Sequence, residues 1–346
     1  TMLFSHVDDT TDATNGAEFV AAARRRWGDF VNSSRFRWVG YAPNLDARTI
    51  IDFRSGALTV EALAADTTRA SGEEARRRLQ AQLERVLSGR DEPPPDGDAE
   101  PAVDPASDAL AGQVIDRDGD PVTDETAAGF AREVAGSADV ESRPIRMPDG
   151  TVRVRQSVTI PLVPDHLRIR AERFLPLVRE MAARFRLEVP LVFAVIHTES
   201  YFNPLAVSSA PAYGLMQLVP HHGGAEAFAN IHGRAWVPTA EYLYVPRNNI
   251  ELGCAYMRIL LDHHLDAVDD PVSRLYCAIS AHNTGSGNVA RAFARSRGAG
   301  VAWRRANDTG PDGVLDILKT RLPHEETRDY LARVLERIPL YEEWAD

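Results

Sequence analysis

The pattern of apolar positions divides the chain into two parts with different predicted structures. In the first part, apolar and polar residues alternate over short stretches, which is the spacing of strands with one buried face. These stretches are residues 36–41, 47–53, 57–63 and 151–163. Helical spacing or composition accompanies them at residues 17–30, 71–88 and 124–134. The first part is therefore predicted to be a mixed α/β domain, residues 1–163.

From about residue 164 onward, the pattern is helical throughout. Apolar residues recur every three or four positions in several long segments. These segments are residues 165–187, 190–202, 248–265, 271–283 and 325–338. The predicted fold class is therefore α+β, with the mixed N-terminal domain followed by an all-helical domain at residues 164–346.

Local signals predict some of the boundaries. Ser71 and Glu74 have the spacing of a capping box, which places the start of the second helix at Ser71. The segment 111–123 contains an Asp-Gly pair that is typical of a hairpin turn. The stretch 91–107 is acidic and rich in proline, so we expect it to form an extended loop rather than part of a core.

Composition narrows the class of protein and of partner. The 346 residues carry a net charge of −11 and the arginines are dispersed, which argues against nucleic acid as a partner. No apolar run reaches the length of about 18 residues that a transmembrane helix needs. The chain opens without a basic segment followed by an apolar one, so no signal peptide is recognised. The residues alone leave open a cytoplasmic protein and an exported protein in mature or truncated form.

No metal or cofactor site is predicted. Cys254 and Cys277 lack the spacing of a metal-binding or redox pair, and no cluster of His, Cys and Asp has zinc spacing. Adjacent histidines occur at 221–222 and 263–264, but neighbouring residues on a helix point about 100° apart. The two cysteines lie on consecutive predicted helices, which leaves both a disulfide and two buried thiols open.

One carboxylate stands alone in an uncharged stretch of the helical domain. Between Val189 and Ala225, Glu199 is the one charged residue apart from three histidines, whereas 26% of the whole chain is charged. It lies near the end of an apolar predicted helix, directly before Asn203 and Pro204, which stop that helix. Poor solvation favours the protonated form of a carboxyl group, and a protonated carboxyl group is a general acid. On an exposed helix end, the same residue would have no such role.

Four short segments resemble the motifs of lytic transglycosylases in the goose-type lysozyme-like superfamily. The first is E-S-x-x-N-P at residues 199–204, and the second is G-L-M-Q at 214–217. The third is A-H-N-T-G at 281–285, where the family has A-Y-N-x-G. The last is E-T-R-D-Y-L at 326–331. The four segments occur in the order that the family has, which makes the resemblance specific.

The N-terminal part shows a looser resemblance. Segments 47–63, 111–122 and 157–167 are similar to the N-terminal domain of the membrane-bound lytic murein transglycosylase C family, and the domain order agrees. The resemblance implies a lysozyme-like helical domain, peptidoglycan glycan strands as the partner and no cofactor. It also implies a periplasmic location with an outer-membrane association through an N-terminal lipid anchor, although no lipobox cysteine occurs near the start of this sequence.

The resemblance further implies a reaction with a single carboxyl group. Glu199 would protonate the oxygen between N-acetylmuramic acid and N-acetylglucosamine, and would then accept a proton from the C6 hydroxyl of the muramic acid. Attack of that hydroxyl on C1 of the same sugar gives a 1,6-anhydro ring without water. The sequence agrees, since no second acid occurs between Ser200 and Ala225.

The matched segments supply the expected substrate-binding residues, which are Ser200, Ser208, Gly214, Met216, Gln217, His282, Asn283 and Tyr330. Gln217 and Asn283 are neutral hydrogen-bonding residues suited to acetamido and hydroxyl groups. His282 departs from the family tyrosine; histidine can donate the same hydrogen bond but can also carry a charge. Two alternatives stay open: a lysozyme-type hydrolase, which would need a second carboxylate, and a catalytically silent peptidoglycan-binding or scaffold protein.

Overall fold

The computed structural model describes residues 3–4, 13–89, 105–147, 149–294 and 298–345, and the chain forms two compact units. The first unit comprises residues 1–172 and 203–209, and the second comprises 173–202 and 210–346. The predicted α+β class is confirmed, because the named strands lie in the first unit and the second is helical. The domain boundary at residue 163 stays a prediction; the division by contacts falls inside helix α5 (His166–Phe185).

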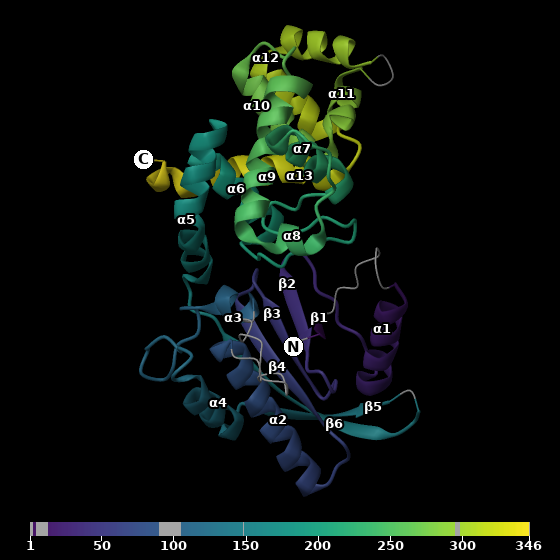
Figure 1. Ribbon diagram of the computed structural model, residues 1–346, viewed down its shortest axis with the longest axis vertical. Coiled ribbons are helices and arrows are strands. Elements are labelled where there is room, and N and C mark those ends of the chain that lie inside the picture. The colour runs from purple at the N-terminus through teal and green to yellow at the C-terminus, as the bar shows by residue number, and fades with distance from the viewer. Residues whose placement is uncertain (1–2, 5–12, 90–104, 148, 295–297, 346) are drawn as a thin grey trace. The chain divides into compact units, whose positions relative to one another are not determined.

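A six-stranded antiparallel sheet forms the centre of the first unit, in the order β1-β2-β3-β4-β6-β5 (Figure 1). Its strands are β1 (Leu3–Phe4), β2 (Arg37–Tyr41), β3 (Ala47–Asp52), β4 (Ala57–Ala64), β5 (Glu141–Arg146) and β6 (Val152–Pro161). The predicted strands are confirmed as β2, β3, β4 and β6. Strand β5 escaped prediction because its sequence, ESRPIR, is almost wholly exposed and shows no apolar alternation.

Helices cover both faces of this sheet. The helices of the unit are α1 (Ala13–Trp27), α2 (Arg69–Ser88), α3 (Pro105–Leu110), α4 (Ala127–Gly136) and the start of α5. On one face, the guanidinium of Arg48 in β3 lies 4.2 Å from the ring of Trp27 in α1. On the other, Gln82 of α2 donates to the hydroxyl of Thr49 at 2.9 Å. Because neighbouring side chains of a strand point to opposite faces, α1 and α2 lie on opposite sides of β3.

The start of α2 differs from the prediction. Thr68, and not Ser71, is the N-cap: its backbone is extended and its hydroxyl accepts the N–H of Ser71 at 3.2 Å. The carboxylate of Asp66 accepts both the N–H and the hydroxyl of Thr68, which holds the turn before the helix. Ser71 therefore lies in the first turn, where it donates to the cap instead of forming it.

One predicted irregular segment is corrected and another is confirmed in a short form. Residues 90–104 lie outside the described part of the chain, but 105–107, the end of the expected acidic loop, form the first turn of α3. The expected hairpin at 111–123 has one bridge, between Ile115 and Pro121, with backbone hydrogen bonds from Asp116 to Asp120 and from Val122 to Val114. A longer ladder does not form there, because Pro121 has no N–H and Asp116 accepts backbone N–H groups within the turn itself.

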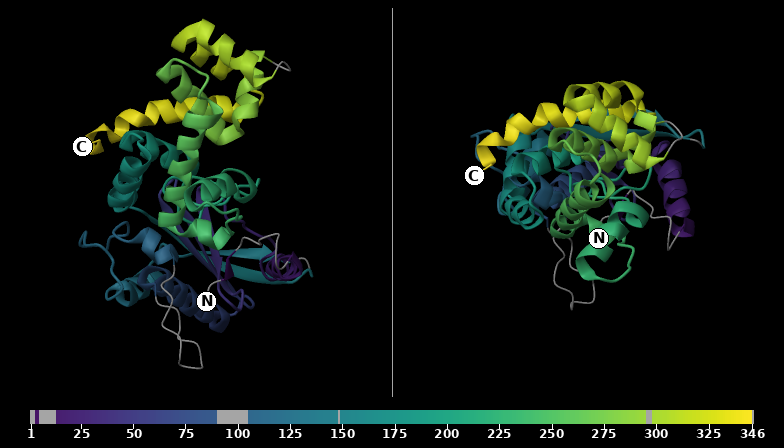
Figure 2. Two further views of the ribbon diagram at one scale, coloured as in Figure 1. Left: turned by 45° about the horizontal axis from the view of Figure 1, so that its top comes forward. Right: turned by 90° about the horizontal axis from the view of Figure 1, so that it is seen from above.

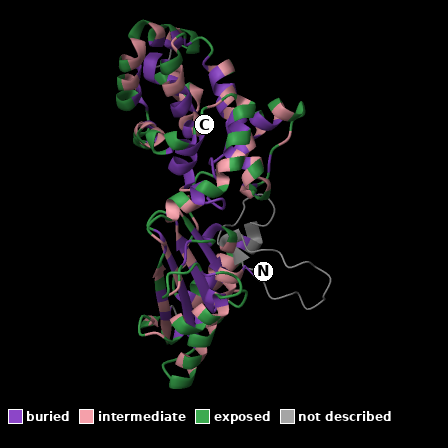
Figure 3. Ribbon diagram, turned by 90° about the vertical axis from the view of Figure 1, so that its left-hand side faces the viewer, coloured by how far each residue is buried: buried purple, intermediate pink, exposed green. Residues whose placement is uncertain are grey.

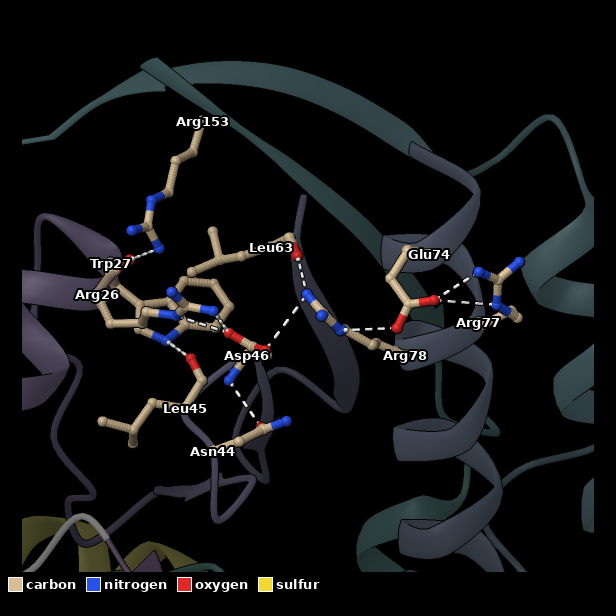
Figure 4. A network of polar contacts seen from close by, with 10 residues as sticks. All are labelled: Arg26, Trp27, Asn44, Leu45, Asp46, Leu63, Glu74, Arg77, Arg78 and Arg153. Carbon is tan, nitrogen blue, oxygen red and sulfur yellow. Dashed lines mark hydrogen bonds and ion pairs between the residues drawn. The ribbon is translucent and has the colours of Figure 1, made fainter. Parts of the chain in front are cut away.

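A polar network connects α1 and α2 through the start of β3 (Figure 4). Asp46, which is buried, accepts a hydrogen bond from Arg26 of α1 and lies 3.3 Å from the guanidinium of Arg78 in α2. Burial, and then the positive charges of Arg153 and Arg78, lower the pKa of Arg26. One carboxylate thus joins helices that lie on opposite faces of the sheet.

The second unit is built from helices. They are the end of α5, α6 (Val189–Ser200), α7 (Ala225–His232), α8 (Ala240–Tyr244), α9 (Pro246–Ile259), α10 (Pro271–Thr284), α11 (Ser286–Ala294), α12 (Ala299–Arg321) and α13 (Glu325–Arg337). Two π-helical turns, η1 (Pro220–Gly224) and η2 (Leu260–His264), and a final 3-10 helix, η3 (Ile338–Trp344), complete it. Figure 2 shows α10, α11 and α12 packed together, with α13 against α10.

Buried residues, purple in Figure 3, run through the helical unit, and helix α6 is buried on all sides, from Pro190 to Ser200. This explains why its sequence is continuously apolar rather than amphipathic. The helix ends two residues before the predicted end, because Tyr201 and Phe202 have left-handed backbones with φ of 52° and 60°. The ring of Phe193 stacks on Tyr341 of η3 at 5.1 Å, so the C-terminal segment packs directly on α6.

Among the described residues, no helix combines the length and the apolar character that crossing a bilayer requires.

Cys254 of α9 and Cys277 of α10 are both buried free thiols, which decides between the two alternatives left open by the sequence. Burial raises the pKa of both thiols, that of Cys277 to about 12. At pH 8 both therefore stay protonated and unreactive. We expect Ellman's reagent to detect almost no thiol in the native protein and two thiols after denaturation without reductant. Rapid modification of the native protein, or no thiol after denaturation, would contradict this description.

Candidate active site

Glu199 lies in the last turn of α6 with only 3% of its surface exposed. The uncharged stretch around it is the reason: the helix and the loop that follows bury nearly every residue. The structure thus confirms the expected burial of the carboxyl group. The exposed helix end, which the sequence left as an alternative, is excluded.

His282 of α10 and Tyr330 of α13 lie beside this carboxyl group. Nδ1 of His282 is 3.3 Å from Oε1 of Glu199 and 3.4 Å from the hydroxyl of Tyr330. The side chain of His282 is only 1% exposed, and among the described residues its Nε2 has no hydrogen-bond partner. Nδ1 can donate to a carboxylate or accept from a carboxylic acid, so the ring can accompany Glu199 through both protonation states.

A second pair of side chains joins the same two helices. The hydroxyl of Thr327 in α13 donates to Oδ1 of Asn283 in α10 at 2.8 Å. This bond orients the Asn283 amide and leaves its NH2 group as the part that can donate to a ligand. The third and fourth motifs therefore contact each other through two pairs of side chains, and one of these pairs includes His282, which lies beside Glu199.

Helix α6 is held in position by α13. Arg337 donates to the hydroxyl of Thr198 at 3.0 Å and to that of Tyr201 at 2.9 Å, and its guanidinium lies 5.0 Å from the Tyr201 ring. These contacts flank Glu199 on both sides in the sequence. They fix the end of the helix and hence the position of its carboxyl group.

The G-L-M-Q segment forms a tight turn closed by paired hydrogen bonds between Tyr213 and Leu218. Asn249 of α9, which is fully buried, organises it: Oδ1 accepts the N–H of Met216 at 2.8 Å, and Nδ2 donates to the carbonyls of Tyr213 and Leu243 at 2.8 Å. Gly214 has a φ of +76° at the point where the backbone passes closest to Asn249.

Three of the expected glycan-binding residues make contacts within the protein. Ser200 is fully buried and its hydroxyl donates to the carbonyl of Leu215 at 2.9 Å, so it links α6 to the turn. Met216 is 1% exposed and packs against Gly253 of α9. Gly214 lets the backbone pass close to Asn249. The contact of these three residues with a sugar stays a prediction.

Gln217 and Ser208 have different settings. Gln217 is at the edge of the turn, 8% exposed, with its Nε2 donating to the carbonyl of Gly214 at 3.0 Å. Ser208 is partly exposed in the segment 203–209, which packs with the first unit. Its expected role in binding the substrate stays a prediction.

Two residues of the site, Asn249 and Tyr256, were not predicted from the sequence. The sequence around Asn249 gave no sign of its burial, because Arg247, Asn248 and Glu251 beside it are polar. Tyr256 of α9 lies with its ring 5.9 Å from that of His282, and no motif includes it. Burial, and then the charge of Glu226, raise the pKa of Tyr256 to about 12, so this phenol stays neutral. Neither residue is near Glu199 in the sequence, which is why the motifs did not show them.

Metal ligands are not grouped in this unit: within the described ranges, no set of three or more His, Cys, Asp or Glu side chains is arranged to hold a metal ion.

Comparison with known proteins places these features in a family. A family described as "Membrane-bound lytic murein transglycosylase C, N-terminal domain" matches residues 11–173, and one described as "Transglycosylase SLT domain" matches residues 176–302. Membrane-bound lytic murein transglycosylase C of Sodalis glossinidius is 35% identical over 301 residues, which cover 86% of this chain and 80% of the relative. This chain belongs to the membrane-bound lytic murein transglycosylase C family.

Other members of the murein transglycosylase C family match over similar lengths. The protein of Serratia proteamaculans is 36% identical over 304 residues, with 86% of this chain and 80% of the relative covered. That of Glaesserella parasuis is 33% identical over 338 residues, with 94% and 87% covered. The resemblance drawn from the four motifs and the domain order is confirmed. The SLT match ends at residue 302, so the position of Tyr330 beside His282 is known from the structure alone.

Proposed function

We propose that Glu199 is the single general acid and base with which this lytic transglycosylase cleaves peptidoglycan. The observation that carries the proposal is the burial of this carboxyl group. In the described part of the chain, three acidic side chains are buried, Asp46, Glu61 and Glu199. The first two are in the N-terminal unit and pair with arginines. Glu199 instead faces an imidazole and, through it, a phenol.

The first step is protonation of the glycosidic oxygen between N-acetylmuramic acid and N-acetylglucosamine. A carboxylic acid shielded from water can deliver its proton to that oxygen, and the developing positive charge is stabilised by the acetamido group of the substrate itself. Asn283 and Gln217, whose neutral amides can donate and accept hydrogen bonds, are the residues that we assign to holding acetamido and hydroxyl groups.

The second step uses the carboxylate that the first step leaves behind. Glu199 accepts the proton of the C6 hydroxyl, and the C6 oxygen attacks C1 to close a 1,6-anhydro ring. The nucleophile belongs to the same sugar, so little further entropy is lost in positioning it. His282 donates through Nδ1 to the carboxylate in this state, with Tyr330 and Tyr256 as neighbours of the ring.

The mass of the products distinguishes a lytic transglycosylase from a lysozyme-type hydrolase. Purified sacculi digested with the full chain should yield muropeptides that end in anhydro sugars, each one water lighter than the product of hydrolysis. Reducing-end sugars as the main product would instead identify a lysozyme-type hydrolase. Binding of sacculi without any soluble product would identify a silent glycan-binding protein.

Location follows from the substrate. The relatives are named membrane-bound, and peptidoglycan lies outside the cytoplasm. We therefore assign this chain to the periplasm, with an association to the outer membrane through an N-terminal lipid anchor as the finer part of the proposal. Fractionation of cells that express the complete gene tests this: recovery with the outer membrane is expected, and recovery with the cytoplasm would contradict it.

Replacement of His282 by tyrosine, the family residue, should preserve substantial activity. Nδ1 of His282 lies 3.3 Å from Oε1 of Glu199. A phenol at this position can donate the same hydrogen bond to the carboxylate. The measurement is the rate of sacculus solubilisation by the variant and by the parent at one neutral pH.

The exposed His232, replaced by glutamine, is the matched control and should keep the rate of the parent. An inactive His282→Tyr variant would show that His282 does not stand in for the tyrosine.

A further inference from the structure

A serine, a histidine and a glutamate line up in the second unit, apart from the groups used in the mechanism above. Oγ of Ser286 lies 3.0 Å from Nδ1 of His264, and Nε2 of His264 lies 2.7 Å from Oε1 of Glu226. The three come from different elements: Ser286 begins α11, His264 ends η2, and Glu226 is in the first turn of α7. No part of the transglycosylase reaction requires this alignment.

The direction of the hydrogen bonds is set by the carboxylate. An ionised Glu226 can only accept, so it selects the His264 tautomer with hydrogen on Nε2. Nδ1 then carries the lone pair and accepts the hydroxyl hydrogen of Ser286. A hydroxyl bonded to a histidine that a third group orients is the arrangement of an activated nucleophile.

The surroundings of Ser286 suit a developing oxyanion. Ser286 and Gly287 are the first residues of the nine-residue helix α11, and the first N–H groups of a helix have no partner within it. Two N–H groups beside a nucleophile can stabilise the oxyanion of an acyl-transfer reaction. Around Gly285 and Gly287, no atom lies within 4 Å of the position of a Cβ, so the space next to Ser286 is open. The side chains of His264 and Glu226 are 33% and 43% exposed, which admits substrate and water.

We propose that Ser286, His264 and Glu226 form a second catalytic centre that hydrolyses a carboxylic ester. Oγ of Ser286 attacks the carbonyl carbon while Nδ1 of His264 takes the hydroxyl proton. The tetrahedral intermediate expels the alcohol, whose oxygen receives that proton from His264. Water, deprotonated by His264, then attacks the acyl-serine; the acid leaves and the proton returns to Oγ. The net reaction consumes one ester and one water and forms one acid and one alcohol.

The substrate class follows from the neighbouring site and rests on the proposed function. Tyr256 lies between the two centres along the chain of contacts, since its ring is 5.9 Å from that of His282 and packs against Gly223, three residues before Glu226. Closure of the anhydro ring needs a free C6 hydroxyl on the muramic acid, and an O-acyl group there would block it. An ester carried by a sugar hydroxyl is therefore the substrate that we assign, because its hydrolysis would restore a cleavable glycan.

Covalent labelling tests the nucleophile independently of any glycan. The full chain is incubated with a fluorophosphonate, and intact mass with peptide mapping locates the adduct. We expect one adduct, on Ser286, none in Ser286→Ala, and labelling slower by roughly 100-fold in His264→Gln, the scale of a lost general base. Glu226→Gln should slow labelling as well. The controls His263→Gln, which changes the adjacent exposed histidine, and Ser209→Ala should label as the parent does. No adduct on Ser286, or an unchanged rate in His264→Gln, overturns the proposal.

Acetate release tests the substrate. O-acetylated murein is incubated with Glu199→Gln, which lacks the transglycosylase acid, and with the same variant carrying Ser286→Ala. Acetate release by the first alone supports the sugar ester. Turnover of p-nitrophenyl acetate by Ser286 without release from murein overturns that assignment. Labelled Ser286 in a parent protein that forms no anhydro product would count against the transglycosylase function instead, so the two failures are distinguishable.

Discussion

Glu199→Gln is expected to abolish the release of anhydromuropeptides from purified sacculi, with a loss of at least about 1,000-fold. Glutamine has the shape of glutamate, but its amide neither protonates the glycosidic oxygen nor accepts the C6 proton. Because one residue carries both steps, nothing else in the site replaces it. The measurement is mass spectrometry of soluble products from matched digests, repeated with a metal chelator, which should change nothing.

The matched control for this variant is Glu188→Gln. Glu188 is the exposed N-cap residue of the same helix and makes no side-chain capping bond, so the loss of its charge should leave cleavage unchanged. Glu199→Gln itself should fold and melt slightly higher, because a neutral amide is easier to bury than an ionisable acid, with a gain of about 1 kcal/mol. Anhydro products from Glu199→Gln would remove the assignment of the acid, and a lower melting temperature would point to a structural role for the carboxylate.

Burial can be predicted from the sequence where it produces apolar residues at a regular spacing or a stretch without charged residues. The strands β2, β3, β4 and β6 were predictable because each has at least one buried face, and Glu199 because its neighbours along the chain carry no charge. Strand β5 is exposed and lacks such a pattern. Helix α12 was missed because Gly310, with a φ of +72°, and Pro311 interrupt its pattern in the middle.

The motifs predicted which residues belong to the site, but not which of them face the substrate and which hold protein segments together. The motifs named Ser200 and Met216 together with Gln217 and Asn283, yet the first two hold protein segments together. A motif records which residues occur, not which way their side chains point. The contacts that decide this come from Asn249 and Arg337, which are distant in the sequence. Likewise, the motifs suggested that His282 is near Glu199, but its contact with Tyr330 needed the folded chain.

The G-L-M-Q turn should be unusually sensitive at its glycine. In Gly214→Ala, the new Cβ would lie 2.2 Å from Nδ2 of Asn249 and 2.3 Å from the backbone carbonyl oxygen of Leu243. The carbonyl cannot rotate away as a flexible side chain would, and moving Asn249 breaks the hydrogen bonds that hold the turn. With the additional penalty of a left-handed alanine, we expect a loss of about 3 kcal/mol or more in unfolding free energy. Displacement of Gln217 should also reduce cleavage of sacculi.

The control variant Gly233→Ala measures the cost of a left-handed alanine without the steric clash that is expected in Gly214→Ala. Gly233 follows α7 in the same unit with a φ of +65°, close to the +76° of Gly214, but no atom lies within 4 Å of its Cβ position. Alanine there should cost only the left-handed conformation, about 1 kcal/mol. Calorimetry of both full-length variants should therefore show a small decrease in melting temperature for Gly233→Ala and a much larger one for Gly214→Ala. Equal decreases would mean that the turn adjusts without strain and that Asn249 does not constrain it.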